Sequence, residues 1–485
     1  MEDNTSKITV GTVLTIAVAI ILVVAMIPAM TMGSGGGGGE GSTVLRLYGI
    51  GDNDYGQQGN GTTDDVRIPT QIGDFDNIQA IECSGYTLAV IDDSKLYMCG
   101  LNDRGQLGTG TTDNVRIPTQ VGTFDKVQAV SVSQYTTAFI NDSKLYVMGW
   151  NDRGQLGTGT TDNVLVPTQV GTFDKVQAVS VYTSNLAFIN DSKLYVLGIN
   201  TYGQLGTGTT DNVLVPTQVG TFDKVQKVVC AGGTTAFIND SKLYVMGWNN
   251  HGQMGTGTTD NVLVPTQVGT FDKVQDLSLS SYITAFINDS KLYAMGWNLY
   301  GGIGFGILGG NVLTPIQVGT FDKVQAVSVV SYSSAFINDS KVYAMGWNNQ
   351  GQMGTGTTEN VPVPTQYGTF DQVEKVISAG LNMFIINDSK LYGSGANSGG
   401  QMGTGTTGSV LVPTQIGDFD NIQHLAALNA TVYFVVESSD DDDGGNTLYT
   451  ALIATTITLL FVAIAMIAIR GFSGNSQEGR RWGMR

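Results

Sequence analysis

Gly149-Trp-Asn-Asp-Arg-Gly-Gln-Leu-Gly157 is the stretch of sequence that decides the fold, because versions of it recur about every 49 residues along the chain. Its central motif, Gly-Gln-x-Gly, begins at Gly56, Gly105, Gly154, Gly203, Gly252, Gly351 and Gly400, with a degenerate copy at Gly301. A second motif, Pro-Thr-Gln, begins at Pro69, Pro118, Pro167, Pro216, Pro265, Pro364 and Pro413, with Pro-Ile-Gln at Pro315. Two motifs that stay in register through eight units predict a protein built from stacked repeats.

Each unit contains short runs that are typical of β-strands. Val127 to Val132, Thr136 to Ile140 and Lys144 to Gly149 are rich in β-branched and aromatic residues and are bounded by Gly, Asn, Asp or Pro. Asn141 to Lys144 has the residue types of a tight hairpin turn. Because three or four short strands cannot bury both faces of their sheet alone, we predict an all-β fold, an eight-bladed β-propeller, with seven blades as the alternative.

The two ends of the repeat region favour closure of the ring. The region opens within a unit, where Leu45 to Gly49 matches a third strand, and ends within a unit, where Thr431 to Val435 matches a second strand. We therefore expect the first strand of the region to complete the last blade.

Two uncharged segments, Ile8 to Met32 and Thr447 to Ile469, flank the repeats, and each can cross about 30 Å of hydrocarbon as an α-helix. We interpret both as transmembrane α-helices; for the first, a cleaved signal peptide or a pilin-like helix is the alternative. The positive-inside rule places the final tail in the cytoplasm because it carries Arg470, Arg480, Arg481 and Arg485. With two spans, the N-terminus is also cytoplasmic and the propeller is extracytoplasmic, at the cell membrane.

This interpretation divides the chain into a cytoplasmic N-terminus (1–7), a transmembrane helix (8–32), a Gly-rich linker (33–44), the propeller (45–437), an acidic linker (438–446), a second transmembrane helix (447–469) and a basic cytoplasmic tail (470–485).

The pattern Gly-x-Asn-x-x-Gly-Gln-Leu-Gly, followed by Val-Pro-Thr-Gln and a strand that ends Ala-Phe-Ile, resembles the regulator of chromosome condensation repeat family over residues 45–437. The resemblance implies a propeller, most often of seven blades, that serves as a nucleotide-exchange factor, an inhibitor or an interaction platform. The chain departs from the family because four units have Met before the strand-ending Gly and Trp after it: Met148 and Trp150, Met246 and Trp248, Met295 and Trp297, and Met345 and Trp347. Tyr replaces the family's loop His in four units.

The composition argues against catalysis and against nucleic acid as a partner. A net charge of −17 disfavours phosphate binding. His251 and His424 are the two histidines, and neither has a nucleophile or metal-ligand pattern beside it. The Gly-Thr-Gly-Thr-Thr stretches open no helix that could bind phosphate, and pairs such as Asp113-Asn114 offer far fewer than the six to eight oxygens that Ca²⁺ needs. We expect no enzyme activity, no cofactor and no metal.

Cys83, Cys99 and Cys230 are too few and too irregularly spaced for a disulfide framework or a zinc site. We expect buried free thiols, with a disulfide between Cys83 and Cys99 as the alternative.

Two features are candidates for a binding face. The tyrosines that replace the family histidine should lie on equivalent loops, with packing in the core as the alternative: Tyr86, Tyr135, Tyr282 and Tyr332. In one unit Phe305, Ile307 and Leu308 stand where the other units have polar turn residues, and this apolar loop is either a contact patch or drift in one copy.

Asn-x-Ser/Thr acceptors for N-glycosylation occur at Asn60, Asn141, Asn190, Asn239, Asn288, Asn338, Asn387 and Asn429. In six of these, Asn-Asp-Ser is also the chemistry of a tight hairpin, so glycans and turn structure are both open interpretations.

The leading hypothesis for function is a membrane-anchored receptor, adhesin or envelope component whose propeller binds an extracellular protein or glycan. A structural lattice subunit that makes homotypic contacts is the alternative. A regulator of the exchange-factor or inhibitor type is disfavoured, because the inferred topology separates the propeller from cytoplasmic GTPases.

Overall fold

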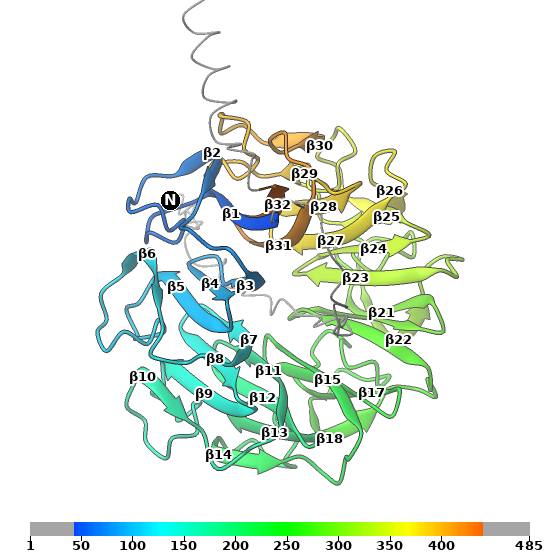
Figure 1. The fold of residues 1–485 in the computed structure, drawn as a ribbon. Coiled ribbons are helices and arrows are strands. Elements are labelled where there is room, and N and C mark those ends of the chain that lie inside the picture. The colour runs from blue at the N-terminus through cyan, green and yellow to red at the C-terminus, as the bar shows by residue number, and fades with distance from the viewer. Residues whose placement is uncertain (1–42, 440–485) are drawn as a thin grey trace, which may run out of the picture. The chain divides into compact units, whose positions relative to one another are not determined.

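A computed structural model describes residues 43–439 as eight four-stranded antiparallel sheets, arranged as the blades of a ring (Figure 1). Residues Leu45–Glu437 form one compact unit. The prediction of an eight-bladed, all-β propeller is confirmed, and the seven-bladed alternative is wrong. The chain has no helix within the described range that is long and apolar enough to cross a bilayer, and both predicted spans lie outside that range.

The strands are grouped here by their place in the blade, and blades 1 to 8 are numbered from β3 onward. The innermost strands are β3 (Ile78–Cys83), β7 (Val127–Val132), β11 (Val176–Tyr182), β15 (Val225–Ala231), β19 (Val274–Leu279), β23 (Val324–Val330), β27 (Val373–Ala379) and β31 (Ile422–Leu428). The second strands are β4 (Thr87–Asp92), β8 (Thr136–Asn141), β12 (Asn185–Asn190), β16 (Thr234–Asn239), β20 (Ile283–Asn288), β24 (Ser333–Asn338), β28 (Asn382–Asn387) and β32 (Thr431–Ser439). The third strands are β5 (Lys95–Gly100), β9 (Lys144–Gly149), β13 (Lys193–Gly198), β17 (Lys242–Gly247), β21 (Lys291–Trp297), β25 (Lys341–Gly346), β29 (Lys390–Gly395) and β1 (Thr43–Gly51). The outer strands are β6 (Val115–Gln120), β10 (Val164–Gln169), β14 (Val213–Gln218), β18 (Val262–Gln267), β22 (Asn311–Gln317), β26 (Val361–Gln366), β30 (Val410–Gln415) and β2 (Val66–Gln71).

The antiparallel order gives the propeller two distinct faces. One, named here the loop face, carries the short hairpin between the first and second strands and the long loop between the third and outer strands. The opposite turn face carries the tight turn between the second and third strands. In blade 2 this turn has positive φ at Asp142 (51°) and Ser143 (59°), which is the geometry of a two-residue hairpin and confirms the turn prediction.

Strands from opposite ends of the chain close the ring. The sheet of blade 8 has the order β2-β1-β32-β31, so the first strand of the repeat region completes the last blade as predicted. The Tyr48 and Phe434 rings stack across this junction at 5.5 Å. The backbone N–H of Glu437 donates to the carbonyl of Asn421 in the connection that precedes β31. The chain therefore enters and leaves the propeller at the turn face.

A fully buried asparagine organises the long loop of each blade. Asn249 is 0% exposed, and its Nδ2 donates to the carbonyls of Thr258 (3.0 Å) and Asp260 (2.9 Å). Its Oδ1 accepts the backbone N–H of Met254 at 2.8 Å. Each blade has this asparagine: Asn53, Asn102, Asn151, Asn200, Asn249, Asn298, Asn348 and Asn397. This asparagine is the third residue of the recurring motif, as Asn151 is in Gly149 to Gly157.

The ordered loop then joins one blade to the next. The N–H of Gly208 donates to the carbonyl of Leu263, which lies on the outer strand of the following blade, at 2.9 Å. Hydrogen bonds between inner strands also join neighbouring blades. The N–H of Val181 donates to Ser131 Oγ (3.2 Å), and that of Cys230 donates to Ser180 Oγ (3.0 Å).

Large aromatic side chains fill the space between sheets. In blade 2, Phe139 is 0% exposed, stacks on Tyr146 at 5.3 Å and meets Phe124 edge-on at 4.9 Å. Similar aromatic groups recur in most blades. Cys83, Cys99 and Cys230 are buried free thiols, and burial raises the pKa of Cys83 and Cys230 to about 12. The disulfide alternative is therefore wrong.

Replacing the buried Asn249 by Ala should lower the free energy of unfolding by about 2–4 kcal/mol, because two buried carbonyls and one N–H lose their partner. Asn250, its exposed neighbour on the same loop, is the matched control, and its replacement by Ala should change stability by about 0.5 kcal/mol or less. Urea unfolding measures both. Equal effects of the two changes would contradict the role assigned to the buried amide.

Glu82 is a buried carboxyl on the inner strand of blade 1. It occupies the position of Ser131 on the inner strand, is 1% exposed, and accepts the N–H of Val132 at 3.1 Å. Burial raises the pKa of its carboxyl well above the ordinary value, although hydrogen bonds from Val132 and Ser131 oppose the shift. The folded state therefore favours the neutral acid, and the stability this gives is lost as pH rises from about 4.3 towards the folded pKa.

Glu82→Gln should therefore match the native chain near pH 4 and become progressively more stable than it as pH rises to 8. The measurement is the difference in unfolding free energy between the two chains at each pH. A difference that does not change with pH would show that the carboxyl titrates alike in the folded and unfolded chains.

Candidate ligand-binding face

Three positions of each blade come together on the loop face. They are the last residue of the short hairpin (the hairpin position), the residue after the strand-ending glycine (the post-glycine position), and the residue two places after the buried asparagine (the loop position). The first two are joined by a backbone hydrogen bond, as between Trp297 N–H and the Tyr282 carbonyl (2.9 Å). The rigid loop then brings the third position beside them.

These positions vary while the surrounding repeat hardly changes. From blade 1 to blade 8, the hairpin position is Tyr86, Tyr135, Ser184, Gly233, Tyr282, Tyr332, Leu381 and Ala430. The post-glycine position is Leu101, Trp150, Ile199, Trp248, Trp297, Trp347, Ala396 and Asp52. The loop position is Arg104, Arg153, Tyr202, His251, Tyr300, Gln350, Gly399 and Tyr55. Aromatic residues are most frequent in blades 4 to 6, and blade 2 has a separate pair, Tyr135 and Trp150.

The aromatic rings of blades 3 to 6 form one continuous cluster, named here the aromatic arc: Tyr202, Trp248, His251, Tyr282, Trp297, Tyr300, Tyr332 and Trp347. Tyr202 is 41% exposed and the other rings are half-buried, so each presents part of its surface to solvent. The arc begins where Tyr202 meets Trp248 at 6.0 Å and ends where Tyr332 meets Trp347 at 5.8 Å. Half-exposed aromatic side chains in this number are typical of binding surfaces.

His251 lies in the middle of the arc. Its ring stacks on Trp297 with centroids 4.6 Å apart and planes 14° apart, and it meets Trp248 edge-on at 5.4 Å. Burial lowers the pKa of the imidazole, while a hydrogen bond with Asn311 opposes the shift. The folded protein therefore favours the neutral imidazole.

The four tyrosines singled out in the sequence occupy equivalent hairpins and are all half-buried, but they divide into two groups. Tyr282 and Tyr332 stack on each other at 5.0 Å within the arc, and burial together with the bond to Tyr282 raises the pKa of Tyr332. Tyr86 instead meets Tyr55 on blade 8 at 5.6 Å, and Tyr135 lies on blade 2.

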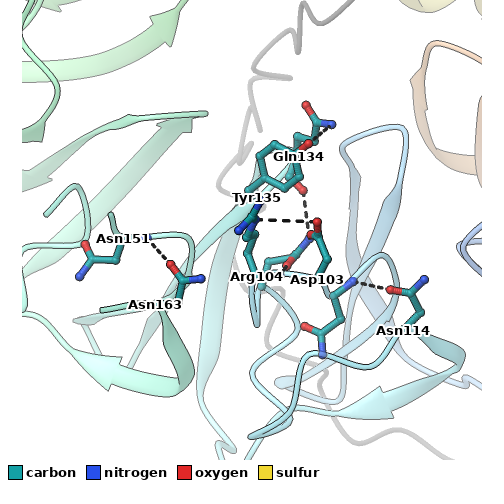
Figure 2. A network of polar contacts seen from close by, with 9 residues as sticks. Asp103, Arg104, Asn114, Gln134, Tyr135, Asn151 and Asn163 are labelled. Carbon is teal, nitrogen blue, oxygen red and sulfur yellow. Dashed lines mark hydrogen bonds and ion pairs between the residues drawn. The ribbon is translucent and has the colours of Figure 1, made fainter. Parts of the chain in front are cut away.

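Polar contacts surround Tyr135 (Figure 2). The Arg104 guanidinium lies 5.9 Å from the Tyr135 ring centroid and 3.8 Å from Asp103, and the Gln134 amide donates to the Tyr135 hydroxyl at 2.8 Å. Trp150 also meets Tyr135 edge-on at 6.2 Å, so blade 2 combines an aromatic pair with charged side chains.

The apolar loop singled out in the sequence belongs to blade 5, which also holds Tyr282 and Trp297 of the arc. Phe305, Ile307 and Leu308 are 40%, 62% and 53% exposed. Asn298 Nδ2 donates to the Ile307 carbonyl, which fixes the loop at its base. The blade at the centre of the arc therefore also exposes the apolar loop.

The Asn-Asp-Ser acceptors lie on the turn face and have a structural role. In each of the six, the Asn side-chain oxygen accepts a backbone N–H at 3.0 Å, as Asn141 does from Lys126. Asp92 of blade 1 accepts the N–H of Asn77 in the same way without being an acceptor for glycans. The hairpin thus explains these asparagines, and glycosylation of them, of Asn60 and of Asn429 stays a prediction.

The described residues contain one group of three carboxylates close enough to share an ion, Asp52, Asp54 and Asp65, with ligand atoms within 4.8 Å. Asp65 already accepts the N–H of Asn53 (3.2 Å), and three side chains are far from the six to eight oxygens of a calcium site. His424 lies away from the arc on β31, where burial and the nearby charge of Lys375 lower its pKa.

Sequence reasoning missed most of the arc. In the sequence, the departures from the family pattern mark only Trp248, Trp297 and Trp347. No motif there groups Tyr202, His251 and Tyr300. Alignment of the eight units in columns would have marked all three variable positions, because their neighbours are nearly constant.

The fold defines a class of protein, a repeat β-propeller, and the loop face is its candidate ligand-binding surface. The model of the regulator of chromosome condensation (RCC1) repeat matches residues 46–91, 93–140, 142–183, 191–238, 240–287, 339–381 and 388–427, well over half of the chain. The chain belongs to this family. The gap between residues 287 and 339 contains the apolar loop, so the blade that departs from the pattern lies at the centre of the arc.

Solved structures agree on the fold. Human WBSCR16 has a TM-score of 0.55 and 17% identity, covering 81% of this chain and 99% of its own. Yeast RCC1 (Prp20) bound to Kap60 has a TM-score of 0.58 and 16% identity, covering 84% and 92%. Prp20p of Saccharomyces cerevisiae has a TM-score of 0.57 and 16% identity, covering 84% and 95%. No curated protein sequence matches the chain significantly.

Protonation of His251 should quench tryptophan fluorescence, because an imidazolium stacked on Trp297 is a quencher and the neutral ring is not. We expect the fluorescence to fall on acidification with a midpoint below the usual histidine pKa of about 6.5. His251→Gln should abolish the transition, and His424→Gln should keep it. A transition that survives in His251→Gln would refute the assigned stacking.

Proposed function

We propose that this protein is a membrane-anchored binding module displayed outside the cytoplasm, and that the loop face is where it binds a protein or glycan. The observation that carries the proposal is the aromatic arc, which is concentrated at the positions that vary between otherwise similar blades. In repeat proteins, a constant scaffold with variable side chains on one face is the arrangement of a recognition surface.

The place where the chain enters and leaves the propeller supports this orientation. Leu45 and Glu437 belong to strands of blade 8 whose outer ends lie at the turn face. A tether attached there leaves the loop face unobstructed. The two long apolar segments and the arginines of the tail supply the anchor and its direction.

Binding is favoured over catalysis by the chemistry of the loop face. His251 is occupied in aromatic stacking, and the thiols are buried with raised pKa values. The related yeast protein Prp20 has been crystallised with Kap60, and its binding to Gsp1p and histones has been studied. These relatives support a protein-binding role, although an exchange factor acting on a cytoplasmic GTPase does not fit the proposed topology.

A lattice subunit is the second candidate, because the outer strands expose a branched apolar side chain at equivalent points of seven blades: Ile68, Ile117, Val166, Val215, Val264, Val363 and Val412. Such a rim could support contacts between copies. The proline in each outer strand and the net charge of −17 both oppose edge-to-edge pairing, so the binding module is preferred.

The topology can be tested by labelling introduced cysteines with a membrane-impermeant maleimide in intact cells. Thr161→Cys, on an exposed loop, should be labelled directly, whereas Ser476→Cys in the tail should be labelled only after permeabilisation. The native chain is the control, because its three cysteines are buried. The reverse pattern would overturn the extracytoplasmic placement.

A further inference from the structure

The loop face of blades 3 to 6 lacks the charges that most macromolecular ligands require. Its hairpins and long loops contain no Lys or Arg, and their carboxylates are Asp211, Asp260 and Glu359. All three are exposed near the ends of the long loops, next to the outer strands. An anionic ligand would find no cation there, and a cationic ligand would find no carboxylate among the rings. The arc is thus suited to an uncharged ligand.

Each ring of the arc is in contact with the next. Successive centroids are 6.0 Å apart from Tyr202 to Trp248, 5.4 Å from Trp248 to His251, and 4.6 Å from His251 to Trp297. The series continues through Tyr332, at 5.2 Å from Trp297, to Trp347. These are contact distances between packed rings, so the half-exposed rings together form one continuous aromatic surface across blades 3 to 6. The C–H face of a hexopyranose packs well on such a surface.

Polar groups of mixed character lie beside the rings. Asn250 and Asn349 are exposed amides in the same loops as His251 and Trp347, and Gln350 accepts the Ser409 hydroxyl at 3.0 Å. An amide both donates and accepts hydrogen bonds, as a tyrosine hydroxyl does. Sugar hydroxyls need groups that both donate and accept hydrogen bonds. The surface of a protein ligand more often presents charged side chains.

From these observations we propose that the aromatic arc binds an extended, uncharged oligosaccharide of hexopyranose units. The inference rests on the proposed function and names the ligand class of the same face. The chain of sugars lies along blades 3 to 6, with its rings on the aromatic side chains and its hydroxyls towards the amides. In blade 5, Phe305, Ile307 and Leu308 stand where the other blades have polar loop residues. This apolar loop is not required for binding of the sugar.

The test titrates the full-length protein with cellohexaose, chitohexaose and mannohexaose, and follows tryptophan fluorescence and heat. We expect at least one to bind, and Trp297→Ala to weaken that binding at least about tenfold, which is the usual effect of losing a central aromatic contact. Trp150→Ala, on blade 2 outside the arc, is the matched control and should leave affinity within about twofold. Unchanged thermal unfolding shows that both variants are folded.

A triple change of Phe305, Ile307 and Leu308 to Ser separates a sugar from a protein ligand. Sugar affinity should be unchanged, whereas a protein partner would use this loop as well. Binding of hexalysine, or of hexagalacturonate, in preference to the neutral sugars would overturn the uncharged-ligand assignment while the loop face stands as the binding face. Absence of any binding to the three neutral sugars at millimolar concentration would also overturn it.

Equal affinities of Trp297→Ala and Trp150→Ala would remove the arc as the sugar site, and with it the glycan assignment. The cysteine labelling tests display outside the cytoplasm independently of the ligand. Failure of the glycan assignment and failure of the proposed function are therefore distinguishable.

Discussion

The hydrogen bonds of one buried asparagine per blade are the constraint on which the rest of this structure depends. Asn249 and its equivalents satisfy backbone groups of a long loop that has no regular secondary structure. The loop so ordered reaches the next blade, where Gly208 bonds to Leu263. Burying an amide is favourable only when its hydrogen bonds are made, so the loop adopts one conformation and the spacing between blades is fixed with it.

A scaffold held in this way leaves the tips of its hairpins free to vary. Gly233 and Tyr282 occupy the same position in adjacent blades, and both have their backbone carbonyl bonded to the following tryptophan. Because this bond uses no side chain, the residue at the hairpin tip contributes little to the fold. The aromatic arc is therefore compatible with an unaltered ring, and blade 5 has departed from the family pattern with its buried Asn298 still in place.

Local features of the repeat could be predicted from the sequence, and contacts between units could not. The strands, the turn at Asp142 and the closing of blade 8 follow from patterns within about 49 residues or from matching the two ends. The separation of Tyr86 from Tyr282 depends on which side chains the neighbouring blades present, namely Tyr55 in one case and His251 in the other. No periodicity distinguishes these two environments, so the four tyrosines were expected to form one set.

The closing blade has a consequence for the order of folding. The strands within each of blades 1 to 7 are contiguous in sequence and can pair as they are synthesised. In contrast, the backbone carbonyl of Gln57 accepts a hydrogen bond from the hydroxyl of Tyr433, which is 376 residues later in the chain. Before β32 is made, one edge of β1 is unpaired. The chain entropy lost on closing the ring is lost when β1 pairs with β32. The ring can therefore close only after β32 has been made, and a chain that ends before β32 leaves one edge of β1 unpaired.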